Sequence, residues 1–193
     1  MKKKNSERIR LIALSGMLAA MITIMTTFIR IPATHNGYTH AGDSMIYLAA
    51  MVLPAPYAAT ASSVGGFIAD ILAGAPEWAF ATAIIKAINT LPFIAVRYYL
   101  KKIGRDNRII SPYTIAMLIP TSLVTIVGYY IADGLMFGFE ASLVTTLITG
   151  WLQPTAGAAV FVLVGSALDG VGFKSKIYPS IMLTGRNEKE KIL

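Results

Sequence analysis

Long apolar stretches, almost free of charged side chains, follow one another along this chain and limit its possible folds more than any other feature. Only 14% of the 193 residues are charged, and 55% are hydrophobic, whereas an ordinary soluble domain has about 25% charged residues. An apolar helix of about twenty residues matches the hydrocarbon thickness of a bilayer. The chain is therefore predicted to be an all-α membrane protein, not a cytosolic enzyme or a disordered protein.

The apolar runs predict a bundle of six helices, each crossing the membrane once. Turn residues, prolines and polar segments separate the runs. The expected helices cover residues 9–29, 43–53, 57–73, 78–100, 112–132 and 140–168. Pro154 lies inside the last helix, where a kink is expected. Because the second helix is only about 16 Å long, the polar loop before it, residues 30–42, is expected to fold into the membrane above it.

The placement of basic residues predicts the orientation of the bundle. All but two of the 17 lysines and arginines lie in clusters at the start, middle and end of the chain. The clusters are Lys2, Lys3, Lys4, Arg8 and Arg10; Arg97, Lys101, Lys102, Arg105 and Arg108; and Lys174, Lys176, Arg186, Lys189 and Lys191. With a cytoplasmic N-terminus, six crossings place all three clusters in the cytoplasm, where such residues accumulate in membrane proteins.

Three segments follow from this topology: a cytoplasmic N-terminus at residues 1–8, a membrane domain at 9–170 and a cytoplasmic tail at 171–193. The first helix is expected to be retained, because no small-residue cleavage site typical of a signal peptide follows it.

The two basic residues outside the clusters are Arg30, in the first loop, and Lys86. Lys86 lies about 12 Å from the outer end of its helix. A charge at this depth should face the bundle interior or a water-filled cavity. Lys86 therefore either serves a ligand or forms a structural ion pair with Asp43 or Asp70.

Polar residues recur at helical spacing on three of the predicted helices, as i, i+3, i+4 and i+7 patterns do on one helix face. The three stripes are Thr82, Lys86 and Asn89; Thr125, Tyr129 and Asp133; and Ser142, Thr146, Thr149 and Gln153. Polar stripes on spanning helices are not expected to face lipid. Together they predict one cavity that opens to the outer side.

The outer side of this topology is acidic. The carboxylates expected there are Asp43, Asp70, Glu77, Asp133 and Glu140. Such a vestibule favours neutral or cationic solutes over anions. Glu77 and Glu140 are more simply explained as solvated helix ends. Asp43 follows a glycine at the start of a helix and is also a candidate N-cap.

The first loop adds His35, Asn36, Tyr38 and His40 to this side, and Trp78 begins the fourth helix. Trp78 is either an interfacial anchor or a ring that stacks on a flat ligand. The two histidines are five residues apart in a loop, without a clear third ligand, so no metal site is predicted.

Several kinds of chemistry are missing from the sequence. There are no cysteines, which excludes disulfides, thiolate metal sites and thiol catalysis. No phosphate-binding G-x-x-x-x-G-K-[ST] loop, G-x-S-x-G or H-E-x-x-H motif is present. The chain is therefore not expected to be an enzyme, and any transport must be driven by other subunits.

Three motifs resemble a known family. G-Y-T-H-A-G-D at residues 37–43, G-G-F-I-A-D at 65–70 and T-A-I-I-K at 82–86 are similar to the S components of energy-coupling factor (ECF) transporters. The similarity covers about residues 9–170 and is greatest to the riboflavin-type group, which includes S components assigned to hydroxymethylpyrimidine or pyridoxine. The resemblance implies a six-helix protein of the bacterial plasma membrane that captures a vitamin from outside.

The resemblance also implies partners. An S component docks on a transmembrane T component, two partner ATPases hydrolyse the ATP, and the S component needs no cofactor and binds no nucleic acid. The small-residue stripe of the first helix is the docking surface in this family, which here corresponds to Ala13, Gly16 and Ala20. Gly16 stands where a strict A-x-x-x-A pattern has alanine.

In this family the first loop caps a pocket formed with the outer halves of helices 4 to 6. The candidate substrate-binding residues are Tyr38, His40, Asp43, Trp78, Thr82, Lys86, Asn89, Tyr129 and Gln153. The expected substrate is hydroxymethylpyrimidine or pyridoxine, with riboflavin as the alternative. Two hypotheses from other classes are an intramembrane enzyme, with Asp43, Asp70 and Lys86 as its acid–base set, and a structural scaffold that binds no ligand.

Overall fold

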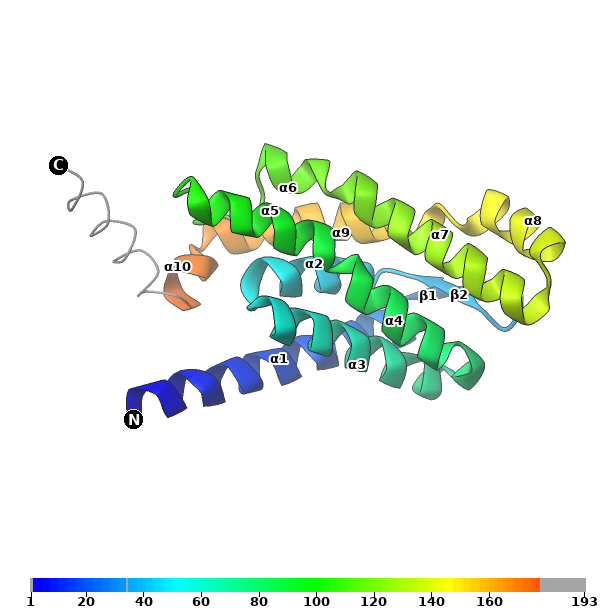
Figure 1. Ribbon diagram of the computed structural model, residues 1–193, viewed down its shortest axis with the longest axis horizontal. Helices are drawn as coiled ribbons and strands as arrows, with labels where there is room; N and C mark the ends of the chain where they lie inside the picture. The colour runs from blue at the N-terminus through cyan, green and yellow to red at the C-terminus, as the bar shows by residue number, and fades with distance from the viewer. Residues whose placement is uncertain (1, 34, 178–193) are drawn as a thin grey trace.

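The computed structural model of the chain describes residues 2–33 and 35–177, and these residues form a helical bundle with one small hairpin (Figure 1). The elements in chain order are α1 (Lys2–Phe28), β1 (Arg30–Pro32), β2 (Tyr38–His40), α2 (Asp43–Val52), α3 (Ala55–Ala73), η1 (Pro76–Trp78), α4 (Ala79–Asn89), α5 (Leu91–Lys102), α6 (Pro112–Ala116), α7 (Leu118–Phe137), α8 (Phe139–Thr149), α9 (Leu152–Gly170) and α10 (Phe173–Ile177).

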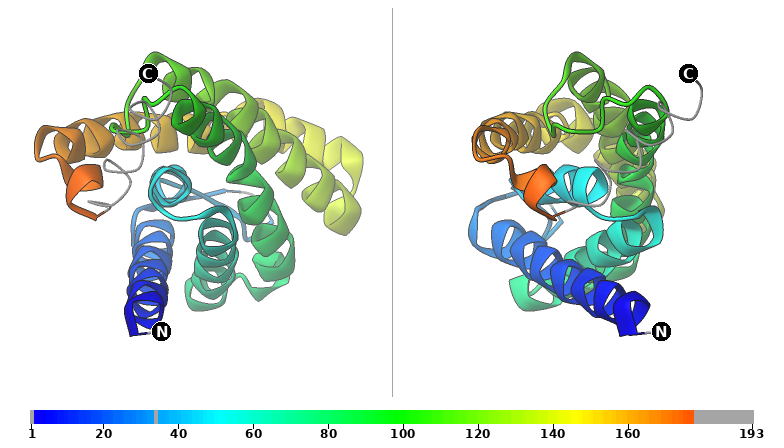
Figure 2. Two further views of the ribbon diagram at one scale, coloured as in Figure 1. Left: turned by 60° about the vertical axis from the view of Figure 1, so that its left-hand side comes forward. Right: turned by 90° about the vertical axis from the view of Figure 1, so that its left-hand side faces the viewer.

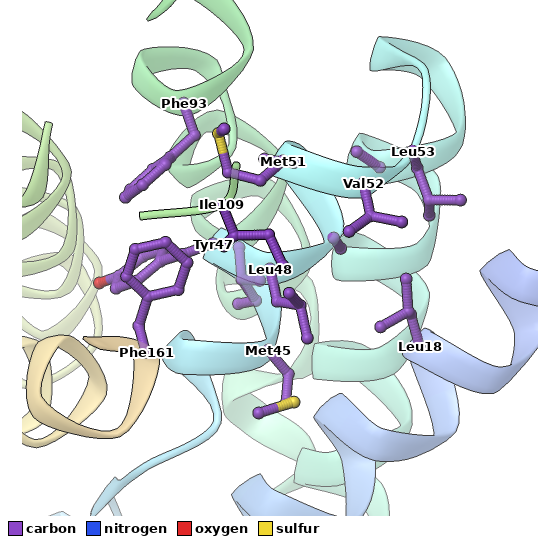
Figure 3. Close-up of a cluster of buried hydrophobic side chains, with 14 of the residues drawn as sticks. Leu18, Met45, Tyr47, Leu48, Met51, Val52, Leu53, Phe93, Ile109 and Phe161 are labelled. Carbon is purple, nitrogen blue, oxygen red and sulfur yellow. The ribbon is translucent and has the colours of Figure 1, made fainter. Parts of the chain in front are cut away.

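The short helix α2 is the centre of the bundle. All ten of its residues are buried, as expected for a helix without a polar face. It packs against α1, α3, α5 and α9, which surround it in Figure 2. The ring of Tyr47 stacks on Phe93 of α5, with 4.9 Å between centroids, and meets Phe161 of α9 edge-on at 5.7 Å (Figure 3). The short second helix of the prediction, residues 43–53, is thus enclosed by neighbouring helices.

Among the residues that the structure describes, four helical spans are long and apolar enough to cross a membrane. They are Asn5–Phe28, Pro76–Lys102, Pro112–Phe137 and Phe139–Gly170. The 19-residue helix α3, rich in alanine, glycine and serine, packs between α1 and α4. The predicted all-α membrane class is therefore confirmed.

Three of the helices predicted as continuous are interrupted. α4 and α5 meet at Thr90, α6 and α7 meet at Met117, and α8 and α9 are separated by Gly150 and Trp151. Each interruption lies within four residues before a proline: Pro92, Pro120 or Pro154. Proline lacks an amide proton and clashes with the carbonyl four residues earlier. The kink predicted around Pro154 is present as this break, whereas the other two breaks correct the prediction.

Two other predicted boundaries were also wrong, and the first loop has structure of its own. α1 begins at Lys2 rather than at residue 9, and α7 continues to Phe137, so that Asp133 is helical rather than part of a connection. The first loop contains an antiparallel hairpin that pairs Arg30 with His40. His35 and Asn36 in its turn have φ angles of 52° and 55°, a left-handed conformation that tight hairpin turns require.

The described basic segments lie at one end of the molecule. The start of α1, the loop after α5, and α10 share this end, while the hairpin and α8 lie at the opposite one (Figure 1). We call the latter the hairpin end. Arg186, Lys189, Lys191 and most of the predicted tail fall outside the described residues.

A buried charge cluster ties three segments together at the basic end. Asp106 accepts hydrogen bonds from Lys174 and, at 3.4 Å, from Arg97 Nε. Arg97 also donates to the carbonyl of Leu53, just after α2. Burial lowers the pKa of Lys174 to about 8, although the adjacent Asp106 favours the charged amine. Asp106 is therefore the carboxylate that joins Arg97 to Lys174.

We expect Asp106→Asn to lower the free energy of unfolding by about 3–5 kcal/mol, the usual effect of breaking a buried ion pair. The variant leaves Arg97 and Lys174 with a neutral partner. A thermal melt in detergent measures the loss, and Lys176→Met, an exposed lysine on the same short helix as Lys174, is the control. Equal melting temperatures for both variants would contradict a stabilising role for the cluster.

Candidate functional site

A cavity of about 90 Å³ lies at the hairpin end, between the hairpin and helices α3, α4, α7, α8 and α9. Six of the nine candidate substrate-binding residues line it: Tyr38, His40, Trp78, Thr82, Tyr129 and Gln153. The polar stripes predicted on separate helices thus converge on one cavity. Three stripe residues, Lys86, Asn89 and Ser142, are not among the lining residues. Ser142 donates instead to the backbone carbonyl of Tyr130 at 2.8 Å.

The other three candidates, Asp43, Lys86 and Asn89, are not among the lining residues and belong to a buried network that adjoins the cavity. Lys86 Nζ donates to Asp43 Oδ1 at 2.6 Å. Gln153 Nε2 donates to Asp43 Oδ2 at 3.0 Å, and Thr125 Oγ1 does so at 3.4 Å. Gln153 and Thr125 also line the cavity, so they connect the ion pair to the wall of the site.

Lys86 is therefore the partner of Asp43, one of the two ion-pair partners proposed from the sequence. Its ammonium also lies 5.0 Å from the centroid of the Tyr129 ring, a distance at which a cation is attracted to an aromatic face. Asn89, one turn further along α4, donates to Thr125 Oγ1 at 2.9 Å. The predicted stripe of α4 is thus confirmed as one polar face, which continues from the cavity into the network.

Asp43 is not a helix cap, contrary to one prediction. Gly42 occupies the N-cap position of α2, and no side chain caps that helix end. The carboxylate of Asp43 turns instead toward Lys86, because a fully buried charge needs a charged partner more than a helix end needs a cap. Gly42 is required there, since an added Cβ would overlap the hydroxyl of Thr26.

The imidazole of His40 is neutral, and its proton position follows from its hydrogen bond. The amide of Gly42 donates to His40 Nδ1 at 3.1 Å, so the proton of the neutral ring is on Nε2. His40 thus brings a neutral ring with an N–H donor to a cavity-lining position.

The hairpin turn forms hydrogen bonds and a ring contact with residues on both sides of the cavity. His35 Nδ1 lies 3.0 Å from Asp133 Oδ1 on α7, and its ring stacks on Phe137 at 4.6 Å. Its carbonyl accepts a hydrogen bond from Trp78 Nε1 at 3.2 Å. Asn36 donates to Glu77 Oε1 at 2.9 Å. The turn therefore joins the start of α4 to the end of α7.

Aromatic rings form one wall of the cavity. Trp78 is 7% exposed, which corrects the interfacial-anchor interpretation. Its ring lies 6.0 Å from that of Tyr129, whose hydroxyl is 3.1 Å from Thr82 Oγ1. Tyr38 donates a hydrogen bond to Asp70 Oδ1. The wall thus offers flat surfaces with polar groups at their edges.

Asp70 and Thr145 also line the cavity but were not among the predicted site residues. The sequence predicts Asp70 as an outer carboxylate, an ion-pair partner or an enzymatic acid, but not as a substrate-binding residue, although it ends the G-G-F-I-A-D motif. Thr145 lies in α8, three residues after Ser142 and four before Thr149, so helical spacing puts it on the same face as the predicted stripe. The exposed Glu77 and Glu140 agree with the prediction of solvated helix ends.

The candidate docking residues Ala13, Gly16 and Ala20 are exposed on α1. An added Cβ at Gly16 would meet nothing within 4 Å. Ser15 and Ala19, on the adjacent face, are partly buried, and the backbone of Ala19 touches α3 near Gly65. The two small-residue pairs therefore differ: one packs inside the bundle and the other faces outward.

Within residues 2–33 and 35–177, no three histidine, aspartate or glutamate side chains are grouped so that they could hold a metal ion.

Two comparisons place the chain among known proteins. The sequence model of a family described as ECF-type riboflavin transporter, S component, matches residues 6–170. A protein of Pyrococcus woesei, described as an uncharacterized protein in gap 3'region, is 26% identical over 159 residues. That alignment covers 82% of this chain and 97% of the Pyrococcus protein.

Proposed function

The chain belongs to the family of ECF-type riboflavin transporter S components, and on this premise we propose that it captures a small heteroaromatic vitamin precursor outside a bacterial cell. Membership makes it a vitamin-transporter subunit whose partners in general are a T component and ATPases. The family consists of transporter subunits, not enzymes. The proposed substrate is hydroxymethylpyrimidine or pyridoxine, and the protein is proposed to need no cofactor of its own.

The size and the lining residues of the cavity support the proposed substrate. A volume of about 90 Å³ holds roughly half a dozen water-sized groups, which suits one substituted ring better than a three-ring flavin with a sugar-alcohol chain. Trp78 and Tyr129 offer ring faces, while Thr82, Gln153 and His40 offer hydrogen-bonding groups. Apolar walls with a few placed polar groups are typical of small-molecule sites.

Riboflavin is the second candidate, because the family is described by that vitamin and the flavin ring is also flat. Calorimetric titration of the purified protein with hydroxymethylpyrimidine, pyridoxine and riboflavin decides between them. We expect tight binding of one small ring and much weaker binding of riboflavin. Tight riboflavin binding with none for the small rings would overturn the substrate proposal and leave the transporter assignment in place.

We propose six membrane crossings with both termini in the cytoplasm. The four long spans supply four crossings, and α2 with its hairpin and α3 supply the other two. The basic segments share one end of the molecule, while the cavity lies at the hairpin end (Figure 1). This separation supports a cytoplasmic basic end, by the positive-inside rule, and a binding site that faces outward.

Transport is proposed to require docking through Ala13, Gly16 and Ala20 on the T component. These residues form an exposed strip of small side chains on α1, and such strips allow helices to approach closely in membranes. The strip belongs to the outer surface of α1, whereas the cavity is formed by other elements, so docking and ligand binding use separate surfaces.

A further inference from the structure

A second cavity, of about 130 Å³, lies where the turn between α2 and α3 faces α5. The residues that line it are Ala50, Leu53, Pro54, Ala55, Ile94, Arg97, Tyr98 and Lys101. Five of these eight residues are apolar, two are cationic and none is acidic. The cavity therefore combines an apolar wall with positive charge.

The two cations lie one helical turn apart on α5. Arg97 and Lys101 are at positions i and i+4 of this helix, so their side chains share a face and repel each other. Arg97 also donates to the carbonyl of Leu53 and to Asp106. Asp106 is shared with Lys174, and Lys101 forms no ion pair with the residues that the structure describes. An anion between Arg97 and Lys101 removes this repulsion.

The apolar wall favours an amphiphile over a free ion. Inorganic phosphate loses its hydration beside Leu53 and Ile94, and burying a charge against apolar side chains is costly. A phospholipid brings its own apolar part to these side chains and places only its phosphate at the cations. Tyr98, also in the lining, is 76% exposed, and tyrosines are enriched at the headgroup level of membranes.

The position and size of the cavity fit the same class of ligand. The end of α5 and the turn between α2 and α3 lie toward the basic end (Figure 1), which the proposed topology places in the cytoplasm. The cytoplasmic leaflet carries anionic lipids, and basic pockets between spanning helices on this side bind their headgroups in other membrane proteins. The cavity holds roughly ten water-sized groups, enough for a phosphate and the glycerol carbons next to it.

We propose that this cavity binds the phosphate of an anionic phospholipid from the cytoplasmic leaflet. Lys101 and Arg97 contact the phosphate, while Leu53 and Ile94 contact the glycerol and the start of an acyl chain. The lipid thereby links the turn between α2 and α3 to α5. The inference uses the proposed orientation of the chain but not the proposed vitamin, since the two cavities share no lining residue.

Native mass spectrometry of the purified full chain, in detergent with added lipid, measures the binding. The probes are phosphatidylglycerol, which is anionic, and phosphatidylcholine with the same acyl chains, whose choline balances the phosphate charge. We expect phosphatidylglycerol to bind about tenfold more tightly, the effect of a charge-assisted contact near the membrane surface. Lys101→Gln should remove this preference. The matched control is Lys102→Gln, at an exposed position that does not line the cavity, and it should keep the preference.

A second pair of variants tests the shape of the cavity without changing its charge. Ala55→Phe fills part of the cavity from an exposed position at the start of α3, and it should weaken phosphatidylglycerol binding to the level of phosphatidylcholine. Thr60→Phe adds the same ring at an exposed position further along α3, outside the lining, and should have no effect. An unchanged lipid preference in Ala55→Phe would show that surface charge alone attracts the lipid, against the proposal.

Equal binding of the two lipids to the unaltered protein, or equal effects of Lys101→Gln and Lys102→Gln, would overturn the proposal. An excess of inorganic phosphate should not displace the lipid; displacement would make free phosphate the ligand and the lipid assignment wrong. Titration with the vitamins is a separate measurement. A protein that prefers the anionic lipid but binds no vitamin contradicts the proposed function, whereas one that binds a vitamin without any lipid preference contradicts only this inference.

Discussion

Gly16→Leu and Ala20→Leu should each abolish vitamin uptake by cells while leaving the ligand affinity of the purified protein unchanged. Both positions are exposed on α1, and the space beside Gly16 is open within 4 Å, so a leucine there fits the isolated protein. The same leucine prevents the close approach of another helix, which small residues permit. Uptake is measured in cells that also make the T component and the ATPases, and affinity is measured by calorimetry.

The matched control is Ala167→Leu, which places the same side chain at an exposed position of α9. It should neither reduce uptake nor release the T component. In a pull-down, the two α1 variants should retain little T component, whereas the control retains a normal amount. Normal transport by both α1 variants would show that this face of α1 is not the docking surface.

The sequence predicted which residues share a helix face better than it predicted their partners. The spacing of Thr82, Lys86 and Asn89 fixed their common face, because a helix turns by the same angle at every residue. It left Asp43 and Asp70 as alternative partners for Lys86, since the spacing within one helix does not determine which side chains of other helices face it. The structure assigns Asp43 to Lys86 and brings Asp70 to Tyr38 instead.

The interruptions of the helices were harder to predict than the helices themselves. Pro92 and Pro120 lie in apolar runs that continue on both sides, so the hydropathy pattern hides the breaks beside them. The hairpin was missed for a related reason. Each of its strands has only three residues, too few for an alternating pattern to appear.

Much of the site was predictable because polar side chains interrupt apolar helices, but two polar residues inside helices, Thr145 and Asp70, were missed. Tyr129 and Gln153 were identified because polar groups are rare in spanning helices. Thr145 was missed although its helical spacing puts it on the face of the predicted stripe. Asp70 was missed because its carboxylate also suited an ion pair.

Lys86→Met and Asp43→Asn should each lower the free energy of unfolding by about 3–5 kcal/mol, the range for removing one partner of a buried ion pair. The two side chains are 1% and 0% exposed and 2.6 Å apart. Either change leaves a buried polar or charged group without its counterion, at the point where α2 and α4 meet. Thermal melts of the purified protein in detergent measure the loss.

The double variant Asp43→Asn with Lys86→Met tests whether the ion pair only stabilises the fold or also contributes to ligand binding. Removing both charges together avoids an unpaired one, so we expect the double variant to recover much of the stability that each single variant loses. Neither residue is among those that line the cavity, so the double variant should keep most of its ligand affinity. If it melts like the unaltered protein but no longer binds the ligand, Lys86 contacts the substrate and the ion pair is part of the binding site.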